Sequence, residues 1–403
     1  MTRARPTALS LIALILGGVG VGTAEFVAMG LLPETARGLG VSIPTAGATI
    51  SAYALGVVVG APLLAVLAAK APRRTLLVSL LVTLAVGDML MALAPNFALA
   101  VAARFATGLP HGAYFGVAAL AAVDLMPAGM AGRAVSRVML GVPLANIAGV
   151  PLGTWIGQQF GWRTTYVVLC VVSLLAAALV WRVVPQSRGR APGAMRRELG
   201  ALKRVQVWLA LLTGAIGFGG MFAMNSYISP TLTEVTGQPA TVVPVVMLLL
   251  GVAGLLGTTL GGRLADWSML WTIGIGLSAL AINLALFTGT AHWLIPAVLS
   301  IMVCSICAGL LVVSLQMRLM QVAGDAENLG AASNHAALNV ANALGAWLGG
   351  VVIAAGHGYT APAWVGAGLA VGGLLIFLVA LVTDSSRHRL VAQDQVVGHP
   401  DPI

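Results

Sequence analysis

Residues 185–204 read PQSRGRAPGAMRRELGALKR, and this stretch divides the chain into two apolar halves. It is polar and rich in arginine, and Pro192 and Gly193 lie near its middle, where they disfavour a continuous helix. Long apolar runs lie on both sides of it. Because about 20 apolar residues cross the ~30 Å of hydrocarbon in a bilayer, each half has room for several membrane spans. We therefore interpret the stretch as a linker between two membrane-embedded bundles.

Twelve apolar stretches are long enough to cross a membrane. They lie near residues 8–32, 44–69, 75–94, 97–122, 134–157 and 164–184 before the linker, and near 206–229, 241–262, 271–289, 292–316, 329–354 and 360–383 after it. The sequence thus predicts an all-α polytopic membrane protein with 12 transmembrane helices in two six-helix bundles. The expected domains are an N-terminal bundle over 1–184, a cytoplasmic linker over 185–205, a C-terminal bundle over 206–383 and a disordered cytoplasmic tail over 384–403.

Lysine and arginine are concentrated in every second gap between these stretches. The basic gaps hold Arg3, Arg5, Lys70, Arg73, Arg74, Arg133, Arg137, Arg182, Arg188, Arg190, Arg196, Arg197, Lys203, Arg204, Arg263, Arg318, Arg387 and Arg389. The intervening gaps hold only Arg37 and Arg163. Since cytoplasmic loops carry the excess of basic residues, we expect both ends of the chain in the cytoplasm.

Composition excludes a soluble protein. The chain is 59% hydrophobic and 8% charged, whereas soluble domains are about 25% charged. The formal net charge of +9 is clustered beside the spans, so anionic lipid headgroups are the expected partner and nucleic acid is not. The three cysteines, Cys170, Cys304 and Cys307, lie inside apolar stretches, and we expect packing roles with neither a disulfide framework nor a metal site.

The two halves repeat each other at an offset of about 197 residues. Gly22 and Pro33 match Gly219 and Pro230, and Gly60 matches Gly257. At an offset of 196, the set Asn146, Gly149 and Gly153 matches Asn342, Gly345 and Gly349. Parallel six-helix repeats related by an axis along the membrane normal describe the major facilitator architecture, in which substrate binds near the midplane between the halves.

Three short motifs resemble those of major facilitator transporters. Gly262-Arg263-Leu264-Ala265-Asp266 is similar to the conserved loop motif of this superfamily, in which the acid braces neighbouring helices. The aligned residue of the first half is Ala69, which departs from that pattern. Arg104, with Gly108 four residues on, resembles the arginine motif of the fourth span. The set Gly141, Gly149, Pro151 and Gly153 resembles the glycine-proline motif of antiporters. The resemblance implies gating roles for Gly149, Pro151, Gly153 and Asp266.

Three further strings resemble the drug/proton antiporter group. They are TAEF (23–26) with GLLP (30–33), PHGAYFG (110–116) and GVPLGT (149–154). Together they are similar to bacterial arabinose or sugar efflux permeases and chloramphenicol-resistance exporters. This resemblance implies a monomeric transporter of the inner membrane that uses the proton motive force and no cofactor.

Three charged residues fall inside apolar stretches: Glu25, Asp88 and Arg104. Each lies roughly 10–12 Å below the expected outer helix ends at 1.5 Å per residue, and each costs about 2.5–3.5 kcal/mol at the bilayer centre on insertion scales. Burial disfavours an ionised carboxyl and a nearby arginine favours it. We therefore expect Glu25 to carry the exchanged proton and to pair with Arg104, so that protonation or substrate releases the arginine. A static ion pair that locks the bundle is the alternative, and it is the leading interpretation for Asp88.

Other polar residues in the spans suit a proton relay or substrate contact. His111 lies near the middle of its span, where it is either a relay or a neutral hydrogen-bonding group in a helix distorted by Pro110. Tyr114 and Phe115, beside it, are candidate substrate contacts, as are Glu25 and, in the second half, Asn225 and Asn339. His335, Asn339 and Asn342 are spaced to share one helical face. Such amides either bind substrate or join helices.

The function expected from these residues is secondary active export. We expect a proton-coupled antiporter that moves small neutral or amphiphilic molecules, such as chloramphenicol-like drugs or sugars, by alternating access. A proton-coupled importer with the same fold is the alternative. No nucleophile or metalloenzyme motif and no phosphate-cradling loop is present in the sequence, so we expect neither an enzyme nor an ATP-driven pump.

Overall fold

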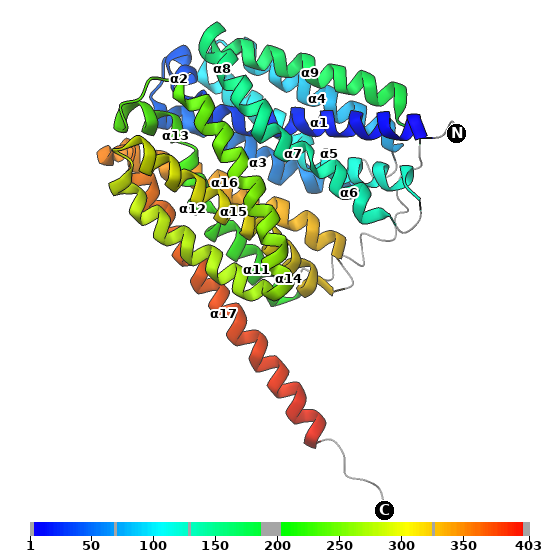
Figure 1. Cartoon of the computed structure of the whole chain (residues 1–403). Coiled ribbons are helices and arrows are strands. Elements are labelled where there is room, and N and C mark those ends of the chain that lie inside the picture. Colours follow the sequence, from blue (N-terminus) through cyan, green and yellow to red (C-terminus); the bar gives the residue numbers. More distant parts are fainter. Residues whose placement is uncertain (1–3, 68–70, 128–129, 187–202, 325–326, 398–403) are drawn as a thin grey trace, which may run out of the picture.

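The computed structural model describes residues 4–67, 71–127, 130–186, 203–324 and 327–397, which are almost entirely helical (Figure 1). The first half consists of α1 (Ala4–Gly30), α2 (Leu32–Leu39), α3 (Ile43–Leu67), α4 (Arg73–Leu93), α5 (Phe97–Leu125), α6 (Ala131–Met139), α7 (Gly141–Leu144), the π-helical turn η1 (Ala145–Gly149), α8 (Val150–Phe160) and α9 (Trp162–Val183). The second half consists of α11 (Val205–Leu212), η3 (Thr213–Gly217), α12 (Gly219–Asn225), α13 (Ile228–Pro230), η4 (Thr231–Val235), α14 (Val242–Thr290), α15 (Leu294–Ala323), α16 (Glu327–Val352), η6 (Ile353–His357) and α17 (Ala361–Val397). Most of the expected linker, residues 187–202, lies outside the described residues.

Eleven helices within the described residues are long and apolar enough to span a membrane. One of them, α14, holds 49 residues, and its backbone is non-helical at Ser268, where φ is −161° and ψ is 105°. This bend divides α14 into two limbs that correspond to the two spans expected near 241–262 and 271–289. Counting both limbs, the structure has a span for each of the twelve apolar stretches, and the predicted all-α membrane fold is confirmed.

The chain after Thr383 differs from the expectation of a disordered tail. Helix α17 continues to Val397, so residues 384–397 are helical rather than disordered. The physical reason lies in the sequence, because neither glycine nor proline occurs between Thr383 and Gly398. A polar composition by itself therefore did not end the helix.

Two spans are built from short pieces rather than single helices. The fifth span runs through α6, α7, η1 and α8, and the seventh through α11, η3 and α12. Pro151, in the first turn of α8, has no backbone N–H for the carbonyl four residues earlier, and the π-helical turn η1 lies just before it. In the seventh span, η3 includes Gly214 and Gly217. Such π-helical turns are local departures from the α-helical hydrogen-bond ladder.

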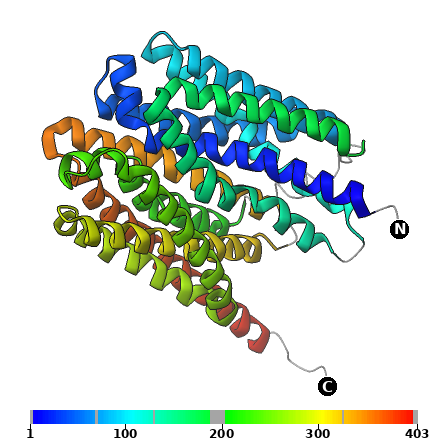
Figure 2. The same cartoon turned by 45° about the horizontal axis from the view of Figure 1, so that its top comes forward.

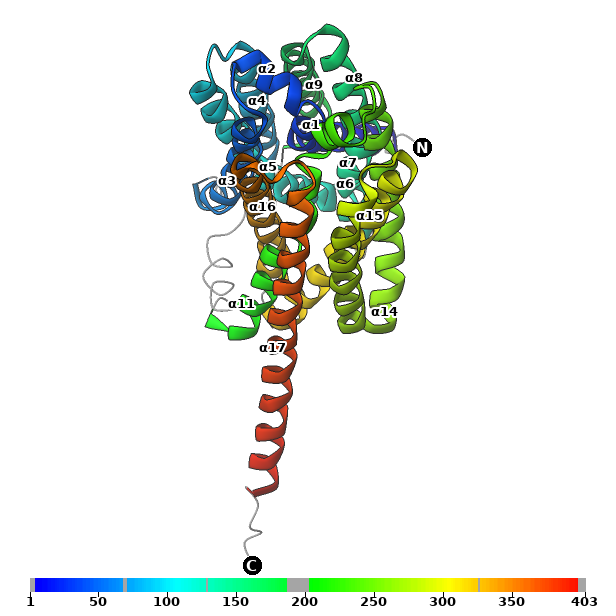
Figure 3. The same ribbon diagram turned by 90° about the vertical axis from the view of Figure 1, so that its left-hand side faces the viewer.

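The two halves form separate cores that meet at one end of the molecule. One buried cluster contains only residues of the first half, and the other contains the core of the second half. The second cluster also includes Met29, Leu32, Ala46 and Ile50, which lie where α1 and α2 join and at the start of α3. We call this end, which carries α2 and α13, the distal face, and the end near both chain termini the terminal face. The helices of the two halves converge at the distal face and diverge toward the terminal face (Figures 1 and 2), and Figure 3 shows the two bundles one above the other.

Glycine allows the closest helix contacts within each half, at positions related by the repeat. A Cβ atom on Gly60 of α3 would lie 2.1 Å from the carbonyl oxygen of Leu109 on α5. Its counterpart Gly257 on α14 would place a Cβ 2.4 Å from the carbonyl oxygen of Ile306 on α15. Because hydrocarbon gives little hydrophobic drive for helices to associate, such small-residue contacts carry much of the packing energy.

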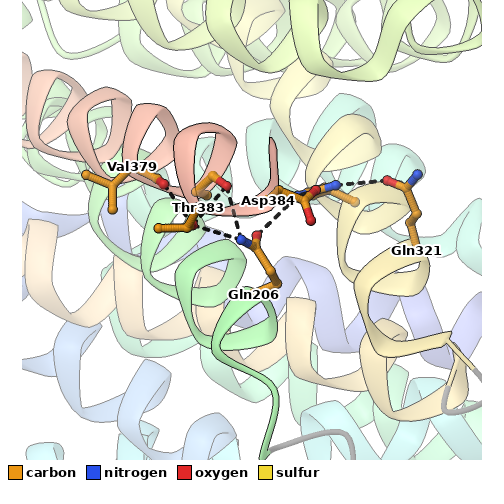
Figure 4. Close-up of polar contacts among 7 residues, drawn as sticks. Gln206, Gln321, Val379, Thr383 and Asp384 are labelled. Carbon is orange, nitrogen blue, oxygen red and sulfur yellow. Dashed lines mark hydrogen bonds and ion pairs between the residues drawn. The ribbon is translucent and has the colours of Figure 1, made fainter. Parts of the chain in front are cut away.

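A polar cluster ties three helices of the second half together at the terminal face (Figure 4). Arg318 of α15 donates to Asp384 Oδ2 of α17 at 2.9 Å, to Gln206 Oε1 of α11 at 3.2 Å and to Gln321 Oε1 at 3.1 Å. The Gln206 amide in turn donates to Thr383 Oγ1 at 2.9 Å. The side chain of Arg318 is only 7% exposed, so these acceptors satisfy a cation that has little access to water. The cluster holds α11, α15 and α17 as one unit.

We predict that Gly257→Ala destabilises the protein, because its Cβ would collide with the main chain of α15. Overpacking of this kind costs about 1–3 kcal/mol. Gly289→Ala on the same helix is the matched control, since nothing lies within 4 Å of its Cβ position. Thermal unfolding in detergent should show a lower melting temperature for Gly257→Ala and little change for Gly289→Ala. Equal melting temperatures for the two variants would contradict the proposed close contact.

Candidate functional site

Glu25 of α1 lies between the two halves and contacts both. Its side chain is buried at 6% exposure. The amide nitrogen of Asn342, on α16 of the second half, donates to Glu25 Oε1 at 3.3 Å. The Nε2 atom of His111, on α5 of the first half, lies 3.7 Å from Glu25 Oε2. One carboxyl group therefore bonds to the second half through Oε1 and faces His111 of the first half through Oε2.

Arg104 lies next to Glu25 but does not bond to its carboxylate. The guanidinium donates to the main-chain carbonyls of Ala24 at 2.7 Å, Glu25 at 3.4 Å and Thr49 at 3.4 Å. It also stacks over the ring of Tyr53, 4.3 Å from the ring centroid. The expected side-chain ion pair is therefore wrong for this state. The reason is that each nitrogen of the fully buried guanidinium already donates to a main-chain carbonyl of α1 or α3.

Tyr53 of α3 joins His111 to the main chain of α1. Its hydroxyl lies 3.0 Å from His111 Nδ1 and 3.3 Å from the carbonyl oxygen of Val21. A hydroxyl has a single proton, so two arrangements fit. When Tyr53 donates to Nδ1, the imidazole proton is on Nε2 and faces Glu25, which suits a carboxylate. When Tyr53 donates to Val21, the proton is on Nδ1 and the Nε2 lone pair faces Glu25, which suits a protonated carboxyl. Each protonation state of Glu25 thus has a matching tautomer of His111, although Nε2 lies 3.7 Å from Oε2, which is longer than a hydrogen bond.

Asp88 of α4 is separated from this group. It is fully buried, and neither carboxyl oxygen has a hydrogen-bond partner. Its charge interacts with that of Arg104 through space, and Tyr166 and Cys170 of α9 are also within electrostatic reach. The structure therefore places Asp88 inside the first half, without a bond to the second half.

Besides Glu25, the structure separates the four other candidate substrate residues into two groups. Tyr114 is fully buried within the first half and donates to the carbonyl of Leu14 at 2.7 Å, and Phe115 packs against His111 with ring centroids 5.4 Å apart. Tyr114 thus joins α5 to α1 and leaves no surface for a ligand in this state. Asn225 and Asn339 are also buried, but each has an amide oxygen without a hydrogen-bond partner. These two keep unfilled acceptors that a substrate could use.

The four predicted gating residues have two different environments. A Cβ on Gly149 would lie 2.0 Å from Thr23 Oγ1, and one on Gly153 would lie 2.9 Å from a methyl group of Val27. These glycines, with Pro151 next to the turn η1, let the fifth span pack directly on α1 beside Glu25. Asp266 is exposed and lies just before the bend at Ser268.

One face of α16 indicates how the site is reached. His335 is exposed, yet it shares a helical face with Asn339 and Asn342. The other exposed residues of this helix, including Val340 and Trp347, lie on a different face. His335 also interacts electrostatically with His111 across the two halves. Because His335 precedes Asn342 on the side of the terminal face, we infer that solvent reaches the site from that face.

Sequence reasoning missed Tyr53 and the ring pair formed by Phe26 and Phe222. Phe26 of α1 and Phe222 of α12 stack across the halves with centroids 6.5 Å apart and an interplanar angle of 6°. The sequence could have indicated Tyr53, since it is a hydroxyl-bearing residue in the middle of an apolar span. It indicated the stacked pair less strongly, only through the position of Phe222 as the repeat counterpart of Glu25. Within the described residues, no group of three or more His, Cys, Asp or Glu side chains could hold a metal ion.

Comparison with known proteins identifies the family. The family model described as Major Facilitator Superfamily matches residues 14–334, and the chain belongs to this family of transporters. It is 39% identical to the inner membrane transport protein YdhP of Escherichia coli (strain K12) over 369 residues, which cover 92% of this chain and 94% of YdhP. It is 31% identical to a chloramphenicol resistance protein of Streptomyces lividans over 366 residues, which cover 90% of this chain and 92% of that one.

A solved structure has the same fold. The inward-facing, unoccupied crystal structure of a bacterial homolog to the human lysosomal transporter Spinster matches with a TM-score of 0.69. The sequence identity is 15%, and the match covers 99% of this chain and 100% of the homolog. The chain is thus a multi-pass membrane transporter and not an enzyme.

We predict that Arg104→Lys lowers stability although it keeps the positive charge. A lysine ammonium cannot reproduce the planar set of donors that reaches carbonyls on two helices, so buried carbonyls lose their partners at about 1–3 kcal/mol each. Arg163→Lys is the control, because Arg163 makes a single part-buried bond, to the carbonyl of Ala94. Melting temperatures in detergent should fall clearly for Arg104→Lys only. A fully stable Arg104→Lys protein would show that the three carbonyl contacts contribute little.

Proposed function

We propose that this protein is a proton-coupled exporter that exchanges protons for small neutral or amphiphilic molecules by alternating access. The observation that carries the proposal is the position of Glu25, a buried carboxyl that bonds across the two halves. On one side of the Glu25 carboxyl lies His111, the candidate proton relay. The amide oxygens without hydrogen-bond partners belong to asparagines of the second half, among them Asn342. Both a proton and a substrate can therefore act on the same group.

Topology supports an inward-facing assignment for this state, and the glycine-proline motif of the fifth span, which resembles that of antiporters, supports export. The basic gaps lie on the side of the chain termini, and the positive-inside rule puts that side in the cytoplasm. With the halves in contact at the distal face, the state described above is then inward-facing. Glu25 is buried in this state, and the exposed His335 lies on the same face of α16 as Asn342, toward the terminal face. Cytoplasmic substrate would approach along this face, and ionised Glu25 would attract neutral donors or cations better than anions.

One exchange cycle can be written with these residues. Substrate binds beside ionised Glu25 from the cytoplasm, and the halves rock to open the distal face. Substrate leaves, and a proton from the outside binds to Glu25, while His111 and Tyr53 shift to the second hydrogen-bond arrangement. The halves rock back and the proton leaves to the cytoplasm. The driving force is the proton motive force, a single copy of the chain holds the whole site, and no cofactor takes part.

The relatives support the choice of substrates. One relative is named a chloramphenicol resistance protein, and the strings around Glu25 and His111 resemble those of sugar efflux permeases. The ring pair of Phe26 and Phe222 beside the carboxyl adds an apolar surface that suits an amphiphilic molecule. Chloramphenicol and simple sugars are therefore the first substrates to test.

We predict that Glu25→Gln abolishes substrate-driven proton movement. The amide keeps the size of the side chain but has no proton to exchange. Proteoliposomes containing a pH-sensitive dye would be exposed to chloramphenicol or to simple sugars, with equal amounts of wild type and variant. Wild type should give a proton signal, and Glu25→Gln should give less than about a tenth of it.

Glu34→Gln is the matched control for this experiment. Glu34 lies on α2 outside the candidate spans and pairs with Arg37, so the same chemical change there should leave the signal near the wild-type value. A normal signal from Glu25→Gln would remove Glu25 from the mechanism and point to Asp88 or His111 as the proton carrier.

A further inference from the structure

Among the described residues, few side-chain hydrogen bonds and ring contacts join the two halves, and they differ in kind. Ser51 of α3 donates to the carbonyl of Ala343 on α16 at 3.1 Å, and Gln158 of α8 donates to the carbonyl of Ala240 at 2.9 Å. Phe26 and Phe222 stack. The fourth contact is the hydrogen bond from Asn342 to Glu25. Among these contacts, only the last includes a group that can gain or lose a proton.

The Asn342 side chain depends on Glu25 for its position. Asn342 is 1% exposed. Its amide nitrogen donates to Glu25 Oε1, and its amide oxygen has no hydrogen-bond partner. The carboxyl is therefore the side chain's sole hydrogen-bond partner among the described residues. Any change in the carboxyl acts directly on α16, which packs against α3 of the first half.

We propose that Asn342 couples the protonation of Glu25 to the opening of the distal face. We call this pair, Glu25 and Asn342, the latch. Ionised Glu25 holds Asn342 by a charge-assisted hydrogen bond, which is about twice as strong as a neutral one. A proton on Glu25 removes the charge and weakens the latch, and a substrate that binds either group replaces it. This inference rests on the proposed exchange of proton and substrate at Glu25.

The latch explains how the distal-closed antiporter avoids opening while it is empty. A carrier that holds neither proton nor substrate must not change conformation, because that step would dissipate the proton motive force or the substrate gradient. In that empty form Glu25 is ionised and the latch is at its strongest, so the distal face stays closed. Either ligand of the exchange weakens the same bond, and each one allows the halves to move.

The groups around Glu25 act on its charge but do not replace Asn342. Arg104 of α5 donates to the main chain beside Glu25, and His111 of α5 faces its second oxygen. Tyr53 of α3 bonds to His111, Asp88 of α4 lies beyond Arg104, and His335 of α16 interacts with His111. All except His335 belong to the first half. They tune the carboxyl, whereas Asn342 connects it to the moving second half.

The sequence repeat makes the latch one-sided. The repeat counterpart of Asn342 is Asn146, and the counterpart of Glu25 is Phe222. Asn146 therefore has no carboxyl in the equivalent position. Of the two contacts related by the repeat, only the one between Asn342 and Glu25 contains a group that a proton can bind. Asn146 therefore serves as the control for Asn342, because it is the same residue type without a carboxyl partner.

The test measures opening of the distal face against pH, without any substrate. Spin labels on Gln159→Cys and His357→Cys, both exposed near that face, would report its opening by electron–electron distance measurements in liposomes. The three buried cysteines would first be replaced. In wild type, the ratio of distal-open to distal-closed molecules should rise as the pH falls, because protonation weakens the latch.

Asn342→Leu should raise the ratio of distal-open to distal-closed molecules at high pH by about tenfold, which is the effect expected from the loss of one hydrogen bond to a charged group. The same variant should remove the pH dependence of that ratio. Asn342→Ala provides a second variant in case leucine disturbs packing. Ser51→Ala removes a neutral bond between the halves, so it should shift the ratio at every pH and keep the pH dependence. Asn146→Leu should behave like wild type.

The result that overturns the proposal is a wild-type pH dependence in both Asn342 variants, or a wild-type protein that opens independently of pH. The proposed function can fail separately. If no proton signal accompanies transport but Asn342→Leu still removes the pH-dependent opening, the results support the latch and contradict proton antiport. If Glu25→Gln abolishes transport while Asn342→Leu keeps the pH-dependent opening, the results support proton antiport and contradict the latch.

Discussion

A guanidinium inside a bilayer must find its hydrogen-bond acceptors within the protein, and the first half is organised around this constraint. Arg104 finds them in the main chain of α1 and α3 rather than in a carboxylate. Because those carbonyls belong to Ala24, Glu25 and Thr49, the arginine fixes the backbone on which Glu25 is mounted. The Glu25 side chain is left free to face the second half. The permanently charged Arg104 thus positions the carboxyl of Glu25, a group that can gain or lose a proton.

The two kinds of contact in the molecule match two mechanical roles. Within each half, glycines such as Gly60 and Gly257 bring helix backbones together, and Arg318 joins three helices at the terminal face. Between the halves, the bonds are few and the stacked rings of Phe26 and Phe222 can slide or separate. This division supports the proposal that each half moves as a unit, and the contact proposed to respond to protons, between Glu25 and Asn342, lies at the boundary between the halves.

The sequence was sufficient to predict the spans, their repeat and the burial of Glu25 within a span, because apolar length, glycine spacing and charged residues inside apolar runs can be identified from residue types alone. It was not sufficient for the partners of Arg104, since main-chain carbonyls have no signature in a sequence. The spacing of His335, Asn339 and Asn342 placed them on one face, but it could not show which of them meets Glu25, because that depends on how α16 packs against the first half. The helix beyond Thr383 was missed because composition was given more weight than the absence of glycine and proline.

The central claim is that Glu25 is the carboxyl whose protonation changes during the cycle. Infrared difference spectroscopy of the protein in liposomes measures this directly, since a protonated carboxyl has a C=O stretching band that a carboxylate lacks. As the pH is lowered, wild type should gain such a band from within the membrane, and Glu25→Gln should not gain it. A band that persists unchanged in Glu25→Gln would contradict the account and assign the titrating group to Asp88.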